Sequence, residues 1–227
     1  MVELPPGALD AGIREQVACF QALGVSFEWK VFDHDQPPGL ADHLQAHGFR
    51  AGEWEATMVV ETTKLAVSPA TPAGISIRRV ADPDEARLID EVHDAAWGEQ
   101  HPRRSIELAK ELREAPADLS VYVAEAAGRP VSCAWVRFTP ACKFAGLFGG
   151  STVPAFRRRG IYRTLVALRA AEALARGYGH FYVDASPASR PILERAGFVC
   201  VSGSRPCLWS LPAEPPTVSG GSSVGDG

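Results

Sequence analysis

Four arginines and a glycine that follow an apolar stretch are the part of this sequence best suited to chemistry. Residues 149–163 read Gly-Gly-Ser-Thr-Val-Pro-Ala-Phe-Arg-Arg-Arg-Gly-Ile-Tyr-Arg, which predicts a strand, a turn and the start of a long helix. The first N–H groups of a helix lack partners, and the helix dipole adds positive potential there. Gly160 has no Cβ to cover these groups, and guanidinium groups suit phosphate oxygens. The turn is therefore predicted to bind phosphate, with a solvated surface turn as the alternative for the arginines alone.

The spacing of these turn residues resembles a known signature. Arg157-x-x-Gly160-x-Tyr162 is similar to the R/Q-x-x-G-x-G/A motif of the GNAT acetyltransferase superfamily, and the residues just before Arg157 resemble what precedes that motif. Residues 192–198, Ile-Leu-Glu-Arg-Ala-Gly-Phe, resemble the helix ending in Gly-Phe that closes the same fold. The resemblance covers about residues 75–211. Tyr162 departs from the family, which has a small residue there, so the fit around the phosphates is open at this position.

The resemblance implies acetyl-CoA as the cosubstrate. In the superfamily the turn holds the pyrophosphate of an acyl-coenzyme A, two parallel strands splay apart, and the pantetheine arm lies in the gap as an added strand would. Carried over residue by residue, the implied coenzyme A ligands are the backbone of Ser151 and Val153 for pantetheine, the amides around Arg158, Arg159, Gly160, Tyr162 and Arg163 for the pyrophosphate, and Ser189, which stands where the family often has an asparagine that touches the same arm.

The groups that would carry out the chemistry depart from the family pattern. In the family reaction an amine attacks the thioester directly, which needs a base, a donor for the oxyanion and often an acid for the leaving thiolate. The family's acid is commonly a tyrosine four residues before the glycine of Gly-Phe, where this chain has Leu193. The family's base is often a glutamate on the strand before the signature, but residues 131–153 contain no carboxylate. The remaining candidates for a catalytic group are His93, Glu99, His101, Glu125 and Asp184.

One expected helix face offers a candidate acceptor pocket. His93 and Trp97 are four residues apart, so both side chains are expected on the same face of a helix. Trp135 is a further candidate for this pocket, with packing in the core as its alternative.

Three functions stay open at this point. The first is an acyl-CoA-dependent N-acyltransferase that transfers the acyl group to a primary amine of a small molecule by direct attack, with ordered water as the base. The second is a catalytically weakened acyl-CoA-binding or regulatory module. The third is a module for another phosphate ligand, although the sequence contains neither G-x-x-x-x-G-K-[S/T] nor G-x-G-x-x-G.

Composition excludes several other classes of function. A formal net charge of −4 argues against bulk affinity for nucleic acid or anionic membranes. The five cysteines lack C-x-x-C spacing, so we expect reduced thiols in a cytoplasmic protein and neither a disulfide framework nor a metal site. No stretch is long and apolar enough to span a bilayer, and no basic region followed by an apolar run opens the chain. The oligomeric state is open, and a homodimer is compatible with the sequence.

The first part of the chain, residues 1–62, is expected to be a degenerate half of a GNAT-like unit. Its pattern of helix, strand, helix ending in Gly-Phe and strand is the pattern found again near the end of the chain. Leu44-x-x-x-Gly48-Phe49 corresponds to Leu193-x-x-x-Gly197-Phe198, and only the second copy has the arginine turn. Chance similarity between two αβαβ units is the alternative.

The main domain is expected over residues 75–211, after an extended linker at 63–74 that is rich in proline. Its pattern predicts a strand, two helices, three strands, a helix, a strand, a helix and final strands. This is an α+β fold with a mixed, mostly antiparallel sheet flanked by helices, which is the order of the GNAT fold. The Gly149-Gly150 pair inside a strand predicts a bulge or the close approach of a ligand. Residues 212–227 are expected to be a disordered tail.

Overall fold

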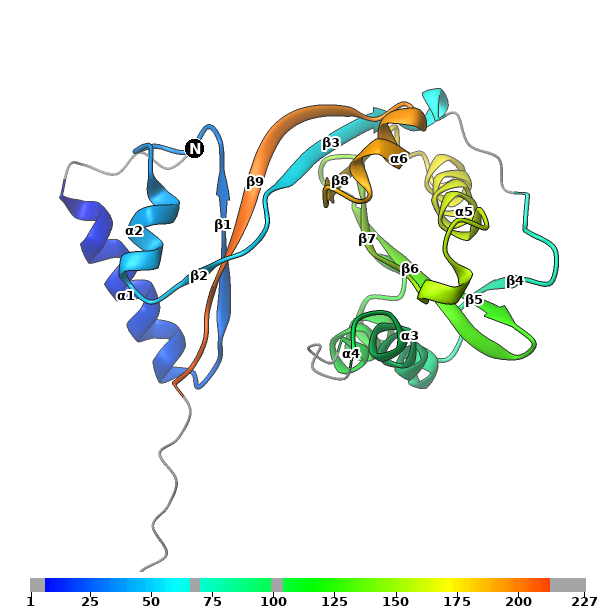
Figure 1. Ribbon diagram of the computed structural model, residues 1–227, viewed down its shortest axis with the longest axis horizontal. Helices are drawn as coiled ribbons and strands as arrows, with labels where there is room; N and C mark the ends of the chain where they lie inside the picture. The colour runs from blue at the N-terminus through cyan, green and yellow to red at the C-terminus, as the bar shows by residue number, and fades with distance from the viewer. Residues whose placement is uncertain (1–6, 66–69, 99–103, 213–227) are drawn as a thin grey trace, which may run out of the picture. The chain divides into compact units, whose positions relative to one another are not determined.

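A computed structural model describes residues 7–65, 70–98 and 104–212, which divide into two compact units (Figure 1). The larger unit is Trp54–Ser204, and the smaller one combines Met1–Glu53 with Arg205–Gly227. Each unit has its own cluster of buried side chains.

The larger unit is built on a mixed sheet with the strand order β9-β3-β8-β7-β6-β5-β4. All neighbouring strands are antiparallel except β7 and β8, which are parallel. The strands are β3 (Glu55–Glu61), β4 (Ser76–Arg79), β5 (Leu119–Ala126), β6 (Arg129–Thr139), β7 (Phe144–Thr152), β8 (His180–Ala185) and β9 (Val199–Trp209). The α-helices are α3 (Arg87–Trp97), α4 (Ser105–Glu114), α5 (Ile161–Ala175) and α6 (Arg190–Arg195), and short 3-10 helices lie at Thr62–Lys64, Pro83–Ala86 and Pro154–Phe156. This confirms the predicted fold class.

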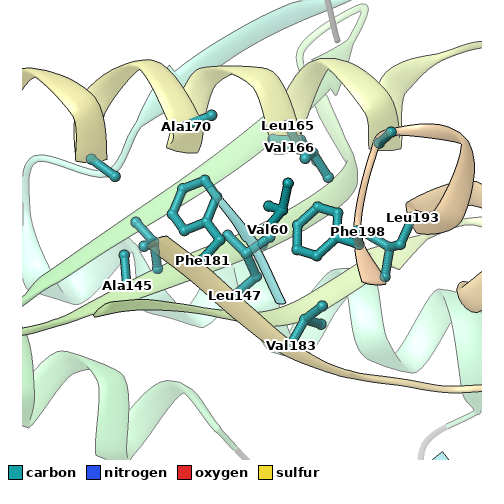
Figure 2. Packing of buried hydrophobic residues seen from close by; sticks show 14 of the residues in the cluster. Val60, Ala145, Leu147, Leu165, Val166, Ala170, Phe181, Val183, Leu193 and Phe198 are labelled. Atoms are coloured by element: carbon teal, nitrogen blue, oxygen red, sulfur yellow. The ribbon is translucent and has the colours of Figure 1, made fainter. Parts of the chain in front are cut away.

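Helices cover both faces of this sheet (Figure 1). On one face Leu165, Val166 and Ala170 of α5 pack with Phe181 of β8 and with Phe198, as Figure 2 shows. On the other face α3 and α4 pack against β5 and β6 around Ile89, Leu108, Val121 and Trp135. Successive side chains of a strand point to opposite faces, and helices cover both faces here, so β5 and β6 are buried over most of their length.

The smaller unit contains α1 (Ala8–Ala22), β1 (Phe27–Phe32), α2 (Leu40–Ala46) and β2 (Arg50–Ala51). Its sheet is completed by the end of β9, which is a neighbour of β1 and pairs antiparallel with β2 through Arg50–Leu208 and Ala51–Cys207. The ring of Phe27 lies 5.3 Å from that of Phe49 and 5.8 Å from that of Trp209. The C-terminal strand residues therefore close the core of the N-terminal part of the chain.

The boundary between the units differs from the expected division at residues 1–62 and 75–211. The expected last strand of the first part, β3, belongs to the larger unit, where it lies between β8 and β9. Its alternate residues Ala56, Met58 and Val60 are buried there. The end of β9 belongs in turn to the smaller unit. A strand pattern in a sequence does not show which strands pair. The prediction therefore assigned β3 and the end of β9 to the wrong units.

In each unit a strand from the other half of the chain lies between two strands. In the larger unit β3 lies between β8 and β9, and in the smaller unit the end of β9 has β1 and β2 as its two neighbours. The order helix, strand, helix, strand is present at both places. This reciprocal arrangement agrees with the expected half-repeat, which stays a prediction. Residues 66–69 of the expected linker and 213–227 of the expected tail lie outside the described residues.

A first prediction concerns the independence of the larger unit. A segment of residues 54–204 is expected to unfold in one cooperative transition, because it keeps β3 between β8 and β9. A segment of residues 75–204 lacks β3, leaves the edges of β8 and β9 unpaired and uncovers Phe181 and Phe198, so it should aggregate. Size-exclusion chromatography and thermal unfolding of the two segments test this, and equal melting temperatures would contradict it.

Candidate functional site

The parallel strands β7 and β8 pair over a short distance only. Their ladder runs through Phe144–His180, Ala145–Phe181 and Gly146–Tyr182, and it contains no further pair although β7 continues to Thr152. We call this opening, between residues 147–152 and 183–185, the fork. Backbone groups on facing edges of a fork lack a strand partner on that side, and an extended ligand can pair with them as a strand would.

A β-bulge shapes the β7 side of the fork. Cys133 of β6 pairs with Ser151, but Trp135 pairs with Phe148, so β7 contains one residue more than β6 between these pairs. Gly149 has a φ of +62°, a left-handed conformation that favours glycine. The bulge expected from the paired glycines is therefore present.

Two aromatic rings cover the glycines of the bulge from opposite faces of the sheet. A Cβ at Gly149 would lie 1.7 Å from the ring of Trp135, which packs with the core on the side of α3 and α4. A Cβ at Gly150 would lie 2.6 Å from the ring of Tyr162, which packs with the core on the side of α5. Neither position has room for a side chain.

This packing explains why Tyr162 can stand where a small residue was expected. The tyrosine ring lies against the β7 backbone, in space that Gly150 leaves free. Burial raises the pKa of Tyr162, so its hydroxyl is neutral. The large side chain of Tyr162 in the turn is thus accommodated by Gly150 in the neighbouring strand, and its ring lies on the surface of the sheet.

The arginine turn joins β7 to α5. Gly160, the residue before the helix, has a φ of +87°, and a Cβ there would meet only Pro72, at 3.8 Å. Arg158 is also left-handed, with a φ of +63°. No side chain caps this end of α5, so its first N–H groups have no capping acceptor among the described residues. Arg158 and Arg163 are exposed beside them. The turn can therefore receive an anion.

The side chain of Arg157, the first arginine of the turn, is fixed by contacts with Thr152 and Trp97. Its Nε donates to the carbonyl oxygen of Thr152 at 3.0 Å, and its guanidinium lies 5.4 Å from the centre of the Trp97 ring. Trp97 donates from Nε1 to Oγ of Ser151 at 3.1 Å. These contacts tie the end of α3 to the end of β7, so the expected pocket residue Trp97 lies beside the expected coenzyme ligand Ser151.

A known protein family matches a large part of the larger unit. Residues 87–198 match the model of the acetyltransferase (GNAT) family. The chain carries a GNAT acetyltransferase domain. No significant relative is found among curated protein sequences.

Solved structures share the fold of this chain. A GCN5-related N-acetyltransferase from Kribbella flavida is 20% identical, with a TM-score of 0.67 over 91% of this chain and 77% of that one. Another from Sphaerobacter thermophilus is 16% identical, with a TM-score of 0.62 over 88% of this chain and 66% of that one. A conserved protein of unknown function from Staphylococcus epidermidis is 14% identical, with a TM-score of 0.61 over 88% of this chain and 81% of that one. These matches extend beyond the GNAT domain into the smaller unit.

Two of the expected coenzyme ligands in the GNAT domain have most of their polar groups engaged. The backbone N–H of Val153 donates to Val131 at 2.9 Å, and its carbonyl accepts from Phe156 at 2.8 Å. The hydroxyl of Ser189 lies 3.2 Å from that of Ser186, at the start of α6. Their contact with coenzyme A stays a prediction, as does that of the turn residues.

Three of the five candidate catalytic residues, His93, Glu125 and Asp184, lie in the described part of the chain. Glu125 lies on β5 and accepts from Arg78 of β4 at 3.2 Å, three strands away from β8, so it does not face the fork. Asp184 lies on β8 in the fork and accepts from Oγ1 of Thr57 at 2.8 Å and from Oγ of Ser204 at 3.5 Å. Glu99 and His101 lie outside the described residues.

His93 lies on α3 near the bulge. It is nearly buried, with 9% of its surface exposed, and its ring centre is 6.2 Å from that of Trp135, whose ring covers Gly149. His93 and Trp97, the two expected pocket residues, are therefore on the α3 side of β7. The position of the usual family acid, Leu193, is fully buried in the core on the α5 side (Figure 2).

Sequence reasoning missed two aromatic residues at the base of the fork. The rings of Phe148 and Tyr182 meet edge to face, 5.9 Å apart. Tyr182 belongs to the last pair of β7 and β8, and Phe148 is the second residue of β7 beyond it. Gly146 makes room for them, since a Cβ there would lie 2.5 Å from Phe148 and 2.6 Å from Tyr182. The alternation of β8 could have indicated Tyr182, which is on the same face as Asp184.

Other kinds of site find no support in the described part of the chain. Within it, no group of three histidine, cysteine, aspartate or glutamate residues could hold a metal ion. No helix there is long and apolar enough to cross a membrane.

A second prediction tests the size compensation at the bulge. Gly150→Ala should lower the free energy of unfolding by about 1–3 kcal/mol, because the new methyl group overlaps the Tyr162 ring. Adding Tyr162→Leu should recover most of this loss, since the smaller side chain gives way. Chemical denaturation measures both, with Gly179→Ala as a control at a position with open space. Additive effects of the two substitutions would show that the ring and the glycine do not compensate each other.

Proposed function

We propose that the GNAT domain transfers an acetyl group from acetyl-CoA to a primary amine of a small molecule. The observation that carries this proposal is the fork between β7 and β8, with the arginine turn at the end of the same β7. The fork offers backbone groups to an extended pantetheine arm, and the turn offers N–H groups to the pyrophosphate at the other end of that arm. Acetyl-CoA has both parts.

The proposed reaction is direct attack on the thioester. The amine nitrogen attacks the carbonyl carbon, a C–N bond forms and the C–S bond breaks, and the electron pair of the broken bond leaves with sulfur. The amine gives up one proton in the process. Only a neutral amine has a lone pair with which to attack, so a proton acceptor near the fork is needed.

We assign the role of proton acceptor to Asp184, acting directly or through a water molecule. Of the candidate carboxylates it is the one that lies on a strand of the fork. Hydrogen bonds from Thr57 and Ser204 fix its orientation on the sheet. Its neighbours on the same face include Tyr182, whose ring and that of Phe148 supply an apolar wall. An amine that carries a small apolar group suits these surroundings.

The leaving thiolate has no tyrosine at the usual family position. Leu193 packs in the core, so a tyrosine introduced there would be buried and not presented to the sulfur. A thiol has a pKa within about one to two units of neutral pH, so a thiolate can leave without a general acid. The absence of a tyrosine at residue 193 therefore slows the reaction without preventing it.

The same leucine favours a second candidate, an acyl-CoA-binding module with weakened catalysis. That module would bind acetyl-CoA through the fork and the turn but release no thiol when amines are added. A module for another phosphate ligand would respond to that ligand instead. A thermal-shift panel of acetyl-CoA, longer acyl-CoAs and ATP, followed by thiol release with a set of amines, separates the three.

A third prediction tests coenzyme binding at the turn. Gly160→Val should abolish the thermal stabilisation by acetyl-CoA, because a branched side chain strains the left-handed backbone and covers the helix N–H groups. Gly177→Val is the matched control, since Gly177 is also left-handed, with a φ of +76° and open space around it, but lies past the other end of α5. Stabilisation by acetyl-CoA that survives Gly160→Val would remove the turn from the binding site.

A fourth prediction tests the proton acceptor. Asp184→Asn should lower kcat/KM by about 10²–10⁴-fold, the usual contribution of a general base, with acetyl-CoA binding unchanged. Glu125→Gln serves as the control, because its carboxylate pairs with Arg78 away from the fork. In the unsubstituted protein kcat/KM should rise with pH as the amine loses its proton. Full activity in the Asp184→Asn protein would leave solvent water as the base.

A further inference from the structure

Arg169 is a buried cation in the middle of α5. Only 1% of its surface is exposed, and it is among the largest fully buried side chains of the described chain. Its Nε donates to the carbonyl oxygen of Leu165 at 2.9 Å, and its Nη1 donates to those of Trp135 at 3.0 Å and Phe148 at 3.4 Å. Burial lowers the pKa of Arg169 to about 10, so the side chain is still protonated at neutral pH.

The titratable side chains whose charge would influence Arg169 electrostatically are neutral. They are Tyr162 of α5, Tyr122 of β5 and Cys133 of β6. Burial raises the pKa of both tyrosines, and it raises the pKa of the Cys133 thiol to about 12. None of the three therefore carries a negative charge near pH 7.

Carboxylates of α5 and α3 are engaged elsewhere. Glu172, one turn further along α5, accepts from Ser120 and Tyr122 and forms ion pairs with Arg176 and Arg79. Asp90, on the α3 side of the sheet, accepts from the backbone and side chain of Ser105. Every hydrogen-bond partner of Arg169 in the described chain is thus a neutral carbonyl group.

The guanidinium lies beneath the fork. Trp135 and Phe148, whose carbonyl oxygens it binds, are the residue pair at one end of the β7 bulge. Phe148 is the second residue of β7 beyond its last pair with β8. A neutral donor such as glutamine would also satisfy these carbonyl groups. A buried charge costs considerably more free energy than a neutral group, so the positive charge needs a separate explanation.

We propose that Arg169 stabilises the negative charge that develops at the fork during acyl transfer. This inference rests on the proposed function. As the C–N bond forms, negative charge gathers on the carbonyl oxygen, and when the C–S bond breaks, the electron pair passes to sulfur while the proton of the amine goes to the proton acceptor. A fixed cation in the low-dielectric interior favours both species. Arg169 acts through the bulge backbone without touching substrate, so it is a positioning residue that offsets the missing acid.

The test measures the thiol pKa of bound coenzyme A. The full-length protein is saturated with free coenzyme A, and the ultraviolet absorbance of the thiolate is followed against pH. Because a nearby positive charge favours a thiolate, the pKa of bound coenzyme A should fall by about one unit below its value in solution. Desulfo-coenzyme A gives the background absorbance. A bound thiol with an unchanged or raised pKa in the unsubstituted protein overturns the proposal without any variant.

Variants separate charge from packing. Arg169→Gln should abolish the fall in thiol pKa and lower kcat by about tenfold, with KM for acetyl-CoA little changed. Arg169→Lys keeps the charge and should restore most of the thiol shift. Arg176→Gln, on the same helix but paired with Glu172, should leave the thiol pKa as it is. A thiol shift retained in Arg169→Gln shows that Arg169 serves the bulge alone. If the unsubstituted protein binds no coenzyme A, the proposed function falls and takes this inference with it, whereas binding without a thiol shift refutes Arg169 alone.

Discussion

The site depends on the early end of pairing between β7 and β8. Backbone N–H and C=O groups released from a ladder are costly to leave unsatisfied, so a fold must hold the two strands apart. Here the bulge at Gly149 turns β7, and Phe148 meets Tyr182, a member of the last strand pair, edge to face. The opening is therefore built from packed side chains and a fixed backbone kink. A rigid opening of this kind keeps its edges available for a ligand without paying to reorganise them.

The bulge in β7 shows how a large side chain at one position is accommodated by a glycine at another. Consecutive residues of a strand face opposite sides, so Gly149 and Gly150 admit one ring each, Trp135 from one side and Tyr162 from the other. Packing density in protein cores leaves little room for error, and a large residue is tolerated when its neighbour becomes small. Tyr162 in the turn and Gly150 in the strand are such a pair, which leaves the turn itself open to an anion.

The sequence predicted the elements well because they are set by local patterns. The helices, the bulge at the paired glycines and the α+β sheet all follow from residues close together in the chain. The partner of β3 could not be predicted, since pairing with β8 and β9 joins residues more than a hundred positions apart. For the same reason the sequence could not choose between Glu125 and Asp184. The two look alike until the strand order places Glu125 on β5, three strands from β8, and Asp184 at the fork. Arg169 escaped notice because an arginine in a helix is usually exposed.

The buried positive charge of Arg169 bears on the function of the protein as well as on its stability. A buried guanidinium bound only to carbonyl groups stabilises a fold less than a neutral donor of the same shape would, because its desolvation is not offset by an anion. The cost is recovered only when negative charge is brought close. A module that merely held acetyl-CoA would bring its phosphates to the turn and a neutral thioester to the fork, where a cation would gain little. Charge reaches the fork only when the thioester reacts. Arg169 therefore favours a catalytic domain, whereas Leu193 favours a binding module. The argument from Arg169 is the stronger, since a leucine in a core stabilises the fold of either one.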